Sequence, residues 1–576
     1  MLQWTRFASL IVVLLVIAGC QQGVSPTPVS SNIDVGGTVV PLGTAVSLET
    51  AVLPTATFPP TPTSPPIPFS TAIDNPAWWD ESIFYEIFVR SFADSDGDGV
   101  GDINGLIENL DYLNDGDPHT NSDLGITGIW LMPIMQSPSY HGYDTVDYYQ
   151  VDDEYGSNED FKRLVEEAND RGIRVIVDLV MNHTSDQHPW FQEARDPASA
   201  QRDWYIWQDE APVDSNYWHQ DDDGSYYYGY FWGGMPDLNY ENPEVTAVMQ
   251  EIIRFWLDDM GADGFRLDAI KHLIEDGRIV ENTPATHTWL QQDFYPYVKD
   301  INPQALTVGE IWSTPDDIVP YIGDEVDIAF EFSLADAILE SAVSERKVHV
   351  ERAQQTAAET YPAGQFATFL ANHDQNRARS RLLSDEQAKV AATLQLMSPG
   401  VPFIYYGEEI GMQGEKPDEN IRRPMQWHGD GGFSTGEPWQ PYFEDYQERH
   451  VSAQSDDPDS LLNHYRALVQ LRNTYPALRS GGWTAVPTDN SSLYAFLRTN
   501  TEESILVLVN LGRKLVDSYT LTLPAGVLTE SMTPVMLMGE GDIQIPALND
   551  AHYQPITELL PYSSTIIRFH EDSAGG

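Results

Sequence analysis

Eight short apolar runs, separated by longer amphipathic or polar stretches, set the strongest constraint on how this chain folds. Runs of this length, with helical spacing of apolar residues between them, are typical of parallel strands joined by crossover helices. Eight such units are the number that closes a (β/α)₈ barrel, which is the α/β fold that we expect. The expected strands are Ile83–Val89, Ile126–Met132, Arg174–Val180, Gly264–Leu267, Leu306–Gly309, Asp327–Phe330, Phe366–Leu370 and Pro402–Tyr405.

Two segments depart from this alternation. Residues 183–236 follow the third strand, and they are too long for an ordinary loop after a barrel strand. We therefore expect an inserted subdomain at the barrel mouth. Residues 483–576 carry alternating strand patterns with no helical pattern between them, which predicts a C-terminal antiparallel β-sandwich domain. The barrel domain is then expected to span residues 76–482.

The first 75 residues predict an export signal and a tether. Residues 1–20 carry one charge, at Arg6, then an apolar run that ends at Cys20, the only cysteine. The ending Ile17-Ala18-Gly19-Cys20 resembles a bacterial lipoprotein processing box, so we expect a lipid on Cys20. The alternatives are an ordinary secretory signal or an incidental cysteine. Residues 21–75 are rich in Pro, Ser and Thr, which favours an extended tether. We expect a body outside the cell, anchored to the cell membrane or outer membrane.

The charge composition excludes several kinds of partner. The chain has 88 Asp and Glu against 31 Lys and Arg, a formal net charge of −57. This charge would repel phosphates, so we expect no nucleic-acid partner. One cysteine excludes an internal disulfide and cysteine-rich zinc modules. A hydrophobic fraction of 41% is nevertheless enough to build folded cores.

Polar residues gather at the ends of four expected strands, where the chemistry of such barrels takes place. One ending of this kind is explained by a helix cap, but four of them together indicate a catalytic site. The four endings are Asp178-Leu-Val-Met-Asn182-His183, Gly264-Phe-Arg266-Leu-Asp268-Ala-Ile-Lys271-His272, Gly309-Glu310-Ile-Trp312 and Asn372-His373-Asp374. Because strand residues alternate between two faces, Arg266 and Asp268 are expected on the same face.

In this order and spacing, the four segments resemble the signature regions of the α-amylase family, glycoside hydrolase family 13, and the resemblance runs over residues 78–571. It implies hydrolysis or transfer at α-glucosidic bonds with retention of configuration, which takes a nucleophile and an acid/base. By resemblance, Asp268 is the nucleophile, Glu310 the proton donor and Asp374 the third carboxylate. The residues that the resemblance assigns to sugar binding are His141, Tyr143, Asp144, His183, Arg266, Lys271 and His373.

Two metal sites are expected. A loop with carboxylates at alternate positions around glycines supplies oxygens for a hard cation, Ca²⁺ or else Mg²⁺, and the alternative is a solvated acidic turn. Its candidate ligands are Asp94, Asp96, Asp98, the carbonyl of Val100 and Asp102. The loop departs from an EF-hand at Gly105, where that motif has Glu. By resemblance alone, Asn182, Asp237 and the carbonyl of His272 form a second Ca²⁺ site, whose fourth ligand is not identified. The alternative is that they are ordinary loop residues.

The sequence indicates the family more firmly than it indicates the activity within that family. Lys271-His272 resembles α-amylases, which favours internal cleavage of α-1,4 chains in starch, glycogen and maltooligosaccharides. Met235-Pro-Asp-Leu-Asn239 and Arg423-Pro-Met-Gln-Trp427 resemble oligo-1,6-glucosidases and neopullulanase-like enzymes, so the chain resembles an intermediate group that includes lipoprotein α-amylases. One alternative is an exo-acting α-glucosidase or a cyclomaltodextrin hydrolase. Another is a non-catalytic glucan-binding lipoprotein, against which the three carboxylates argue. We expect a monomer.

Overall fold

The computed structural model describes residues 77–571, apart from residues 213–215, 525–526, 529–531 and 545–552. The expected signal, the tether and Cys20 lie outside these residues. Among the residues that are described, no helix is both long and apolar enough to cross a membrane.

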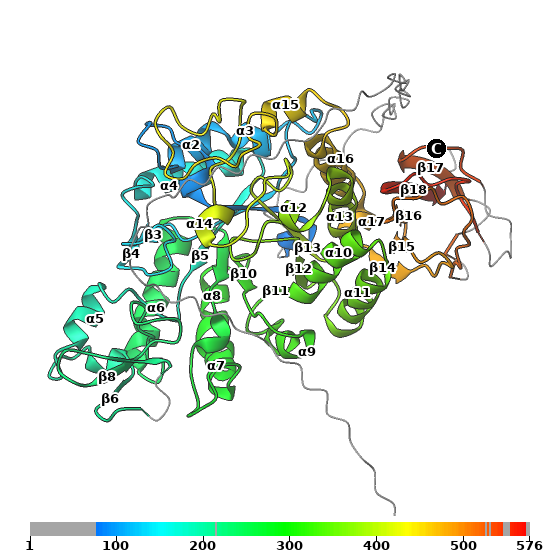
Figure 1. Ribbon diagram of the computed structural model, residues 1–576. Coiled ribbons are helices and arrows are strands. Elements are labelled where there is room, and N and C mark those ends of the chain that lie inside the picture. Colours follow the sequence, from blue (N-terminus) through cyan, green and yellow to red (C-terminus); the bar gives the residue numbers. More distant parts are fainter. Residues whose placement is uncertain (1–76, 213–215, 525–526, 529–531, 545–552, 572–576) are drawn as a thin grey trace, which may run out of the picture. The chain divides into compact units, whose positions relative to one another are not determined.

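Eight parallel strands close into a barrel in the order β1-β13-β12-β11-β10-β9-β5-β2 (Figure 1). In this register Phe84 of the first strand lies opposite Gly128 on one side and Phe403 on the other. The expected (β/α)₈ fold is therefore confirmed. The strands are β1 (Phe84–Ile87), β2 (Gly128–Leu131), β5 (Arg174–Leu179), β9 (Gly264–Leu267), β10 (Leu306–Gly309), β11 (Ile328–Phe330), β12 (Phe366–Thr368) and β13 (Val401–Tyr405).

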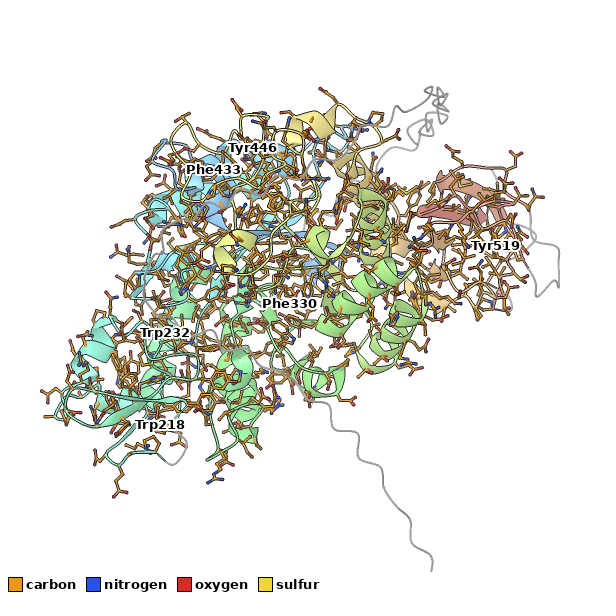
Figure 2. All side chains as sticks on the ribbon, in the orientation of Figure 1. Trp218, Trp232, Phe330, Phe433, Tyr446 and Tyr519 are labelled. Carbon is orange, nitrogen blue, oxygen red and sulfur yellow. The ribbon has the colours of Figure 1, made fainter. Side chains whose placement is uncertain are left out.

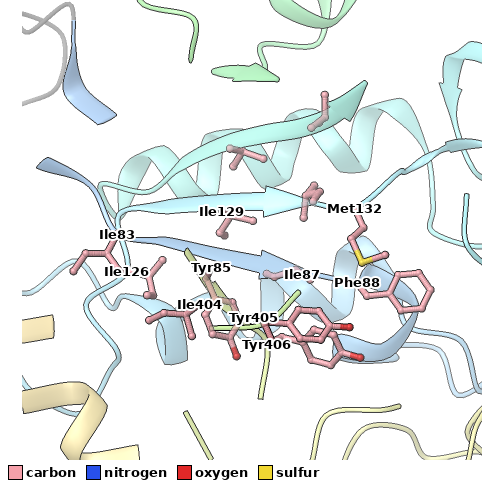
Figure 3. Packing of buried hydrophobic residues seen from close by; sticks show 14 of the residues in the cluster. Ile83, Tyr85, Ile87, Phe88, Ile126, Ile129, Met132, Ile404, Tyr405 and Tyr406 are labelled. Carbon is pink, nitrogen blue, oxygen red and sulfur yellow. The ribbon is translucent and has the colours of Figure 1, made fainter. Parts of the chain in front are cut away.

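The strands are apolar on both faces, because one face fills the barrel and the other packs against the helices. Phe84 and Phe403 stack inside, with ring centroids 4.5 Å apart. Tyr85 and Ile87 belong instead to the larger cluster that includes helix residues (Figure 3). Charged side chains are few within the strands, with Glu86 in β1 and Arg266 in β9 among them, and further polar side chains follow the strand ends at one rim.

Helices and short strands occupy the connections. Helix α4 begins with a capping box, in which Ser157 and Asp160 bond reciprocally to each other's backbone. The helices are α1 (Val89–Phe92), α2 (Ile103–Glu108), α3 (Leu110–Leu113), α4 (Asn158–Asp170), α6 (Pro243–Arg254), α7 (Pro284–Trp289), α8 (Tyr295–Ile301), α9 (Pro315–Ile318), α10 (Phe332–Ser344), α11 (Val348–Thr360), α12 (Ala378–Arg381), α13 (Asp385–Met397), α14 (Asp418–Ile421), α15 (Val451–Ser455), α16 (Leu461–Thr474) and α17 (Pro476–Arg479). A short ladder of β3 (Met135–Gln136) and β4 (Asp147–Val151) precedes α4.

The segment after β5 forms a small structure of its own, as the sequence predicts. It contains α5 (Pro189–Ala194) and a three-stranded sheet of β6 (Trp207–Gln208), β8 (Tyr226–Tyr228) and β7 (Trp218–Gln220). Aromatic side chains fill it, among them Trp218 and the exposed Trp232 (Figure 2). The segment returns to the barrel where Leu238 N–H donates to the carbonyl of Asn182 at 2.9 Å.

The C-terminal region contains an antiparallel sheet in the order β14-β15-β16-β18-β17, and an antiparallel domain is what the sequence predicts there. Its strands are β14 (Gly482–Ala485), β15 (Leu493–Thr499), β16 (Glu503–Asn510), β17 (Met532–Met538) and β18 (Ser563–Glu571). A second apolar layer packs on one face, but its described residues form isolated bridges rather than strands. Residues 518–523 carry an alternating pattern, but within them only Leu521 forms bridges, to Thr488 and to Tyr553, and Pro524 that follows cannot continue a ladder.

Candidate active site

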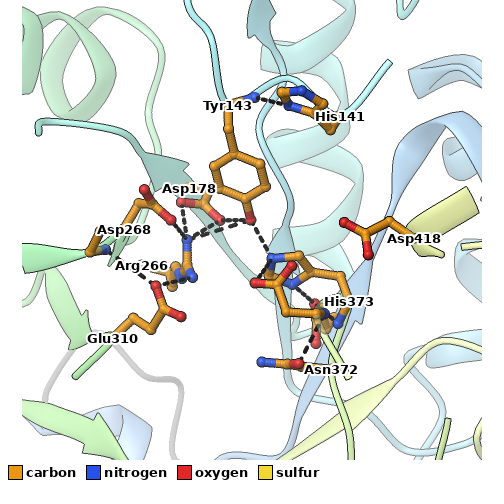
Figure 4. A network of polar contacts seen from close by, with 12 residues as sticks. His141, Tyr143, Asp178, Arg266, Asp268, Glu310, Asn372, His373 and Asp418 are labelled. Carbon is orange, nitrogen blue, oxygen red and sulfur yellow. Dashed lines mark hydrogen bonds and ion pairs between the residues drawn. The ribbon is translucent and has the colours of Figure 1, made fainter. Parts of the chain in front are cut away.

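One guanidinium joins three carboxyl groups at the rim of the barrel (Figure 4). Arg266 Nη1 donates to Asp178 Oδ1 and to Asp268 Oδ1, both at 2.8 Å. Its Nη2 lies 2.8 Å from Glu310 Oε2. Arg266 is 1% exposed, so these ion pairs are shielded from water and are stronger than surface pairs. The ends of β5, β9 and β10 are thereby brought to one point.

The three carboxyl groups are not equivalent. Burial raises the pKa of Asp178 to about 7, although Arg266 opposes the shift. Burial also raises the pKa of Asp268 against the effect of Arg266, and it raises that of Glu310 together with the charges of Asp268 and Asp374. Asp268 accepts a hydrogen bond from Arg266 Nη1, and Glu310 lies 2.8 Å from Arg266 Nη2 and accepts from the backbone N–H of Ala269 at 3.2 Å. The hydrogen bond from Arg266 lowers the pKa of Asp268, whereas the charge of Asp268 raises that of Glu310, and both effects are in the direction of an ionised Asp268 beside a protonated Glu310.

A buried imidazolium lies on the other side of the network. His373 contacts Glu86 Oε1 through Nδ1 at 2.6 Å and Asp374 Oδ2 through Nε2 at 3.2 Å. Burial lowers the pKa of His373, but these two carboxylates outweigh it and raise the value to about 9. The same pairing lowers the pKa of Asp374 despite its burial. Tyr143 Oη joins the two halves, since it lies 2.6 Å from His373 Nε2 and donates to Asp178 at 3.1 Å.

Asp374 is held in place by a second arginine, Arg422, which is not one of the predicted site residues. Arg422 Nη2 donates to Asp374 Oδ1 at 3.0 Å and to Asp418 at 3.2 Å, and Arg422 Nε donates to the carbonyl of His373 at 3.0 Å. Arg422, Asp418 and Glu86 are not among the residues predicted from the sequence. A charged residue inside the apolar run of β1 was the available signal for Glu86, and Arg422 directly precedes the segment that begins at Arg423.

The remaining predicted sugar-binding residues lie in two places: His183, His141 and Asp144 are around Tyr143, and Lys271 is beside Trp312. His183 Nε2 lies 3.1 Å from the carbonyl of Tyr143, and burial lowers its pKa to about 4, so the ring is neutral. His141 Nδ1 accepts from the N–H of Tyr143 at 3.1 Å, and buried Asp144 accepts from Ser137 at 2.8 Å. The ammonium group of Lys271 donates to the backbone carbonyl of Trp312 at 3.0 Å and pairs with the carboxylate of Glu281 at 2.7 Å.

The loop after α1 brings candidate metal ligands together. Asp94, Asp96 and Asp102 each offer a carboxylate oxygen, and these oxygens lie within 4.8 Å of one another. Asp98 is outside that group; it accepts from the N–H of Val100 at 2.8 Å. Asp94 accepts from Gly97 at 2.7 Å and from Gly99 at 2.8 Å, which curls the loop around the carboxylates. Clustered hard oxygens of this kind fit Ca²⁺ or Mg²⁺.

The second predicted metal site contains buried oxygens that have no partner. Asn182 Oδ1 and Asp237 Oδ2 are both without a hydrogen bond, and their residues are 1% and 2% exposed. The ring of His272 is engaged elsewhere, because its Nδ1 lies 2.7 Å from the carbonyl of Val280. The group that His272 can offer to a cation is therefore its backbone carbonyl. Unpartnered buried oxygens are costly, and a cation would satisfy them, so the residues fit the expected group.

Comparisons with known proteins agree with this geometry. Residues 86–481 match the family model described as alpha amylase, catalytic domain. The chain is 41% identical over 448 residues to alpha-amylase 3 of Dictyoglomus thermophilum, covering 76% of this chain and 86% of that protein. It is 34% identical over 524 residues to an oligo-1,6-glucosidase of Parageobacillus thermoglucosidasius, covering 76% and 91%. The crystal structure of an alpha-amylase from H. orenii superposes with a TM-score of 0.73 and 40% identity over 85% of this chain and 99% of that one.

Proposed function

The chain belongs to the α-amylase family of glycoside hydrolases, and we propose that it cleaves internal α-1,4-glucosidic bonds of starch, glycogen and maltooligosaccharides. The observation that carries the proposal is the placement of Asp268 and Glu310 on two nitrogens of the Arg266 guanidinium. Two carboxyl groups close together, one ionised and one protonated, are what a retaining mechanism needs.

In the first step, Asp268 attacks the anomeric carbon as Glu310 gives its proton to the leaving glycosidic oxygen. The bond from that carbon to the oxygen breaks, and a covalent glycosyl ester with Asp268 forms. In the second step, Glu310 takes a proton from water, the water oxygen attacks the anomeric carbon and the ester breaks. Configuration is inverted twice and therefore retained.

Other residues hold the sugar. We assign Asp374 and the His373 imidazolium to the hydroxyl groups of the ring at the cleavage point, since charged groups make the stronger hydrogen bonds. Tyr143 offers its aromatic face, with His141, Asp144 and His183 around it, and Lys271 contacts the leaving-group side. Arg266, which the resemblance assigns to sugar binding, is 1% exposed, and we assign it instead to positioning the carboxylates together with Arg422.

A second candidate is an exo-acting α-glucosidase or a cyclomaltodextrinase of neopullulanase type. The similarity to an oligo-1,6-glucosidase favours it. The product profile on starch, maltotriose, pullulan and cyclodextrins separates the two. Endo cleavage predicts a rapid fall of iodine staining with mixed short products. Release of glucose alone from chain ends, with slow loss of staining, would favour the second candidate.

The nucleophile assignment has its own test. Asp268→Asn is expected to abolish turnover while the protein stays folded and still binds maltoheptaose. The matched control is Asp258→Asn, which removes one exposed carboxylate in the turn that follows α6 and is expected to keep full activity. Near-normal activity of Asp268→Asn would overturn the assignment. Unchanged starch and maltoheptaose with the native protein would favour a binding function.

We also propose Ca²⁺ at both predicted sites. At the loop it is held by Asp94, Asp96, Asp98, the Val100 carbonyl and Asp102, and at the second site by Asn182, Asp237 and the His272 carbonyl. Bound there, the cation would neutralise clustered carboxylates and fix loops at the barrel rim. We further propose a lipid on Cys20 that anchors the exported protein; Cys20→Ser should move it from the detergent phase to the aqueous phase.

A further inference from the structure

A charged side chain points into the barrel from its first strand. Glu86 is two residues after Phe84 on β1, so the two side chains share a face, and the ring of Phe84 belongs to the interior cluster. In the register of the barrel, Glu86 lies opposite Trp130 of β2 and Tyr405 of β13. Glu86 is 2% exposed. A carboxylate in such apolar surroundings needs a partner of opposite charge.

That partner is the imidazole ring of His373. Glu86 Oε1 lies 2.6 Å from His373 Nδ1 and also accepts from the backbone N–H of His373 at 3.3 Å. Among the residues that the structure describes, this ring is the basic group within ion-pair distance of Glu86. The ring is fully buried, with Trp130 edge-on at a centroid distance of 5.6 Å. Water therefore does not compete for the contact between carboxylate and ring.

The other nitrogen of the ring also carries a proton (Figure 4). Tyr143 Oη donates its one proton to Asp178 Oδ2 at 3.1 Å, so it accepts from His373 Nε2, which lies 2.6 Å away. Nε2 faces a second acceptor as well, Asp374 Oδ2 at 3.2 Å. With the Glu86 carboxylate at Nδ1, each nitrogen of the ring has an acceptor opposite it. This is the hydrogen-bonding pattern of an imidazolium, in which both nitrogens donate.

We propose that Glu86 is a positioning residue of the active site, whose buried carboxylate keeps His373 protonated on both nitrogens and directs its Nε2–H at the sugar. The inference rests on the proposed function, which supplies the sugar. Glu86 acts only through His373, because it meets the ring at Nδ1 and not at the nitrogen that faces Asp374. Without this carboxylate, burial favours a neutral ring with a single N–H. A ring with that proton on Nδ1 would face Asp374 with a lone pair and could not donate to the sugar.

The pH range over which the ring keeps its charge depends on the groups around it. Burial lowers the pKa of His373, but Asp374 and then Glu86 outweigh burial and raise the value to about 9. The ring therefore stays charged at lower pH and loses its proton as the pH rises past this value, and removing the Glu86 charge moves the loss to lower pH. The other titratable and charged groups of the network are Tyr143, Asp178 of β5, Arg266 and Asp268 at the end of β9, Glu310 after β10 and Arg422 after α14.

The charge of the ring can be measured directly on the free, full-length protein. Protein labelled with ¹⁵N in histidine is titrated from pH 5 to pH 10 by NMR, and the His373 signals are those that His373→Asn lacks. The native ring should lose its proton at a pH of about 9. Glu86→Gln keeps the shape but not the charge, and it should lower this midpoint by about one pH unit or more, since a nearby opposite charge shifts a pKa by about 1–3. Equal midpoints would overturn the proposal.

Binding of maltoheptaose tests whether the sugar needs this charge. In a Glu310→Gln background, which stops turnover, calorimetry compares Glu86 with Glu86→Gln. The two proteins should bind equally at pH 6, whereas at pH 9.5 Glu86→Gln should bind about tenfold more weakly, as a midpoint lower by one pH unit requires. Equal binding at both pH values would overturn the role of Glu86 in holding the sugar. No binding at any pH with Glu86 intact would contradict the proposed function instead, and the NMR titration would still decide the charge of His373.

The matched control is another buried glutamate that follows a barrel strand. Glu331 comes directly after β11, caps α10 by accepting from Leu334 N–H at 3.1 Å, and accepts from Tyr361. Glu331→Gln should leave both the His373 midpoint and the binding of maltoheptaose unchanged. Thermal melts at each pH verify folding. If Glu86→Gln does not fold, Glu86→Asp is titrated in its place: its carboxylate stands farther from Nδ1, so the midpoint should fall by less, and an unchanged midpoint would contradict the proposal.

Discussion

At the scale of single residues, the active site depends on the shape of Arg266 as much as on its charge. In Arg266→Lys the ammonium keeps the charge, but as a single point it cannot serve Asp178, Asp268 and Glu310 together. Losing a partner of a buried charge costs about 2–5 kcal/mol, so kcat should fall about 30-fold or more. Steady-state kinetics on maltoheptaose measure the effect.

The matched control is Arg254→Lys, an exposed arginine at the end of α6, which should keep its kcat. Circular dichroism and thermal melts distinguish a chemical defect from unfolding. If Arg266→Lys retained kcat within twofold of the native protein, the claim that the planar guanidinium positions both carboxyl groups would be wrong.

Glu408 provides a test of pH dependence away from the chemistry. Burial, then the charge of Glu409, raises its pKa from 4.5 to about 8, and Tyr465 donates to it at 3.0 Å. Because the folded state keeps a proton that the unfolded state releases, this contribution to stability is complete below pH 4.5 and is lost as the pH rises to 8. Glu408→Gln removes the titration and keeps the shape. Its stability relative to the native protein should rise by up to about 1.4 kcal/mol per pH unit across this range.

Free energies of unfolding by urea, measured from pH 5 to pH 9, check this expectation. Glu437→Gln, an exposed glutamate, is the control and should give a constant difference. A constant difference for Glu408→Gln as well would mean that Glu408 does not keep its proton in the folded state.

The sequence predicted the chemical groups of the site better than their partners. Arg266 and Asp268 are two positions apart on one strand, so their shared face follows from strand geometry alone. The pairing of Glu86 with His373 depends on closure of the barrel, which brings together segments that are distant in sequence. Arg422 reaches Asp374 from a loop without a regular pattern, so no periodicity indicates where its side chain points.

At the scale of elements, the ends of strands could be predicted where an apolar run is bounded by a glycine or a charged residue. The expected strands Gly264–Leu267 and Leu306–Gly309 coincide with β9 and β10. A helical pattern runs over residues 243–260, but the α-helix α6 ends at Arg254 and continues as a wider turn, in which Met260 N–H donates to the carbonyl of Phe255. Part of the second layer of the C-terminal region lies outside the described residues, and the contacts described there are bridges set by tertiary packing.

The C-terminal end of α13 shows how one element depends on another. Its terminal carbonyls and those that follow, at Leu396, Ser398 and Gly400, accept hydrogen bonds from the buried guanidinium of Arg472 on α16. In Arg472→Met these carbonyls lose their donors in a dry environment. We expect the free energy of unfolding to fall by about 3 kcal/mol, as for other broken buried charged contacts.

Urea denaturation measures the change, and Arg346→Met, at an exposed arginine before α11, is the control and should be near neutral. A stability equal to the native protein in Arg472→Met would show that water or other donors satisfy the end of α13. Activity measured below the transition should stay close to native, because Arg472 contacts the chain just before β13 begins, whereas the carboxyl groups of Figure 4 lie toward the ends of the strands.

At the scale of the whole molecule, the net charge of −57 exceeds what the active site and the metal sites can use. The 31 Lys and Arg residues leave most of the 88 carboxyl groups without a basic partner, so like charges repel across the folded protein. Salt shortens the range of this repulsion from about 10 Å at 0.1 M to about 3 Å at 1 M. The melting temperature should therefore rise with NaCl, by about 1 °C for each kcal/mol of repulsion removed in a chain of this size.

The measurement needs calcium held at saturation, because salt would otherwise also weaken calcium binding and lower stability. Choline chloride at equal ionic strength is the matched control: screening predicts the same rise with either salt, whereas specific binding of Na⁺ predicts a rise with NaCl alone. Activity on neutral maltoheptaose should change little, since the carboxyl groups that react are buried and shielded by Arg266. A melting temperature that is flat or falls from 0.05 to 1 M salt would mean that the acidic surface does not destabilise the fold.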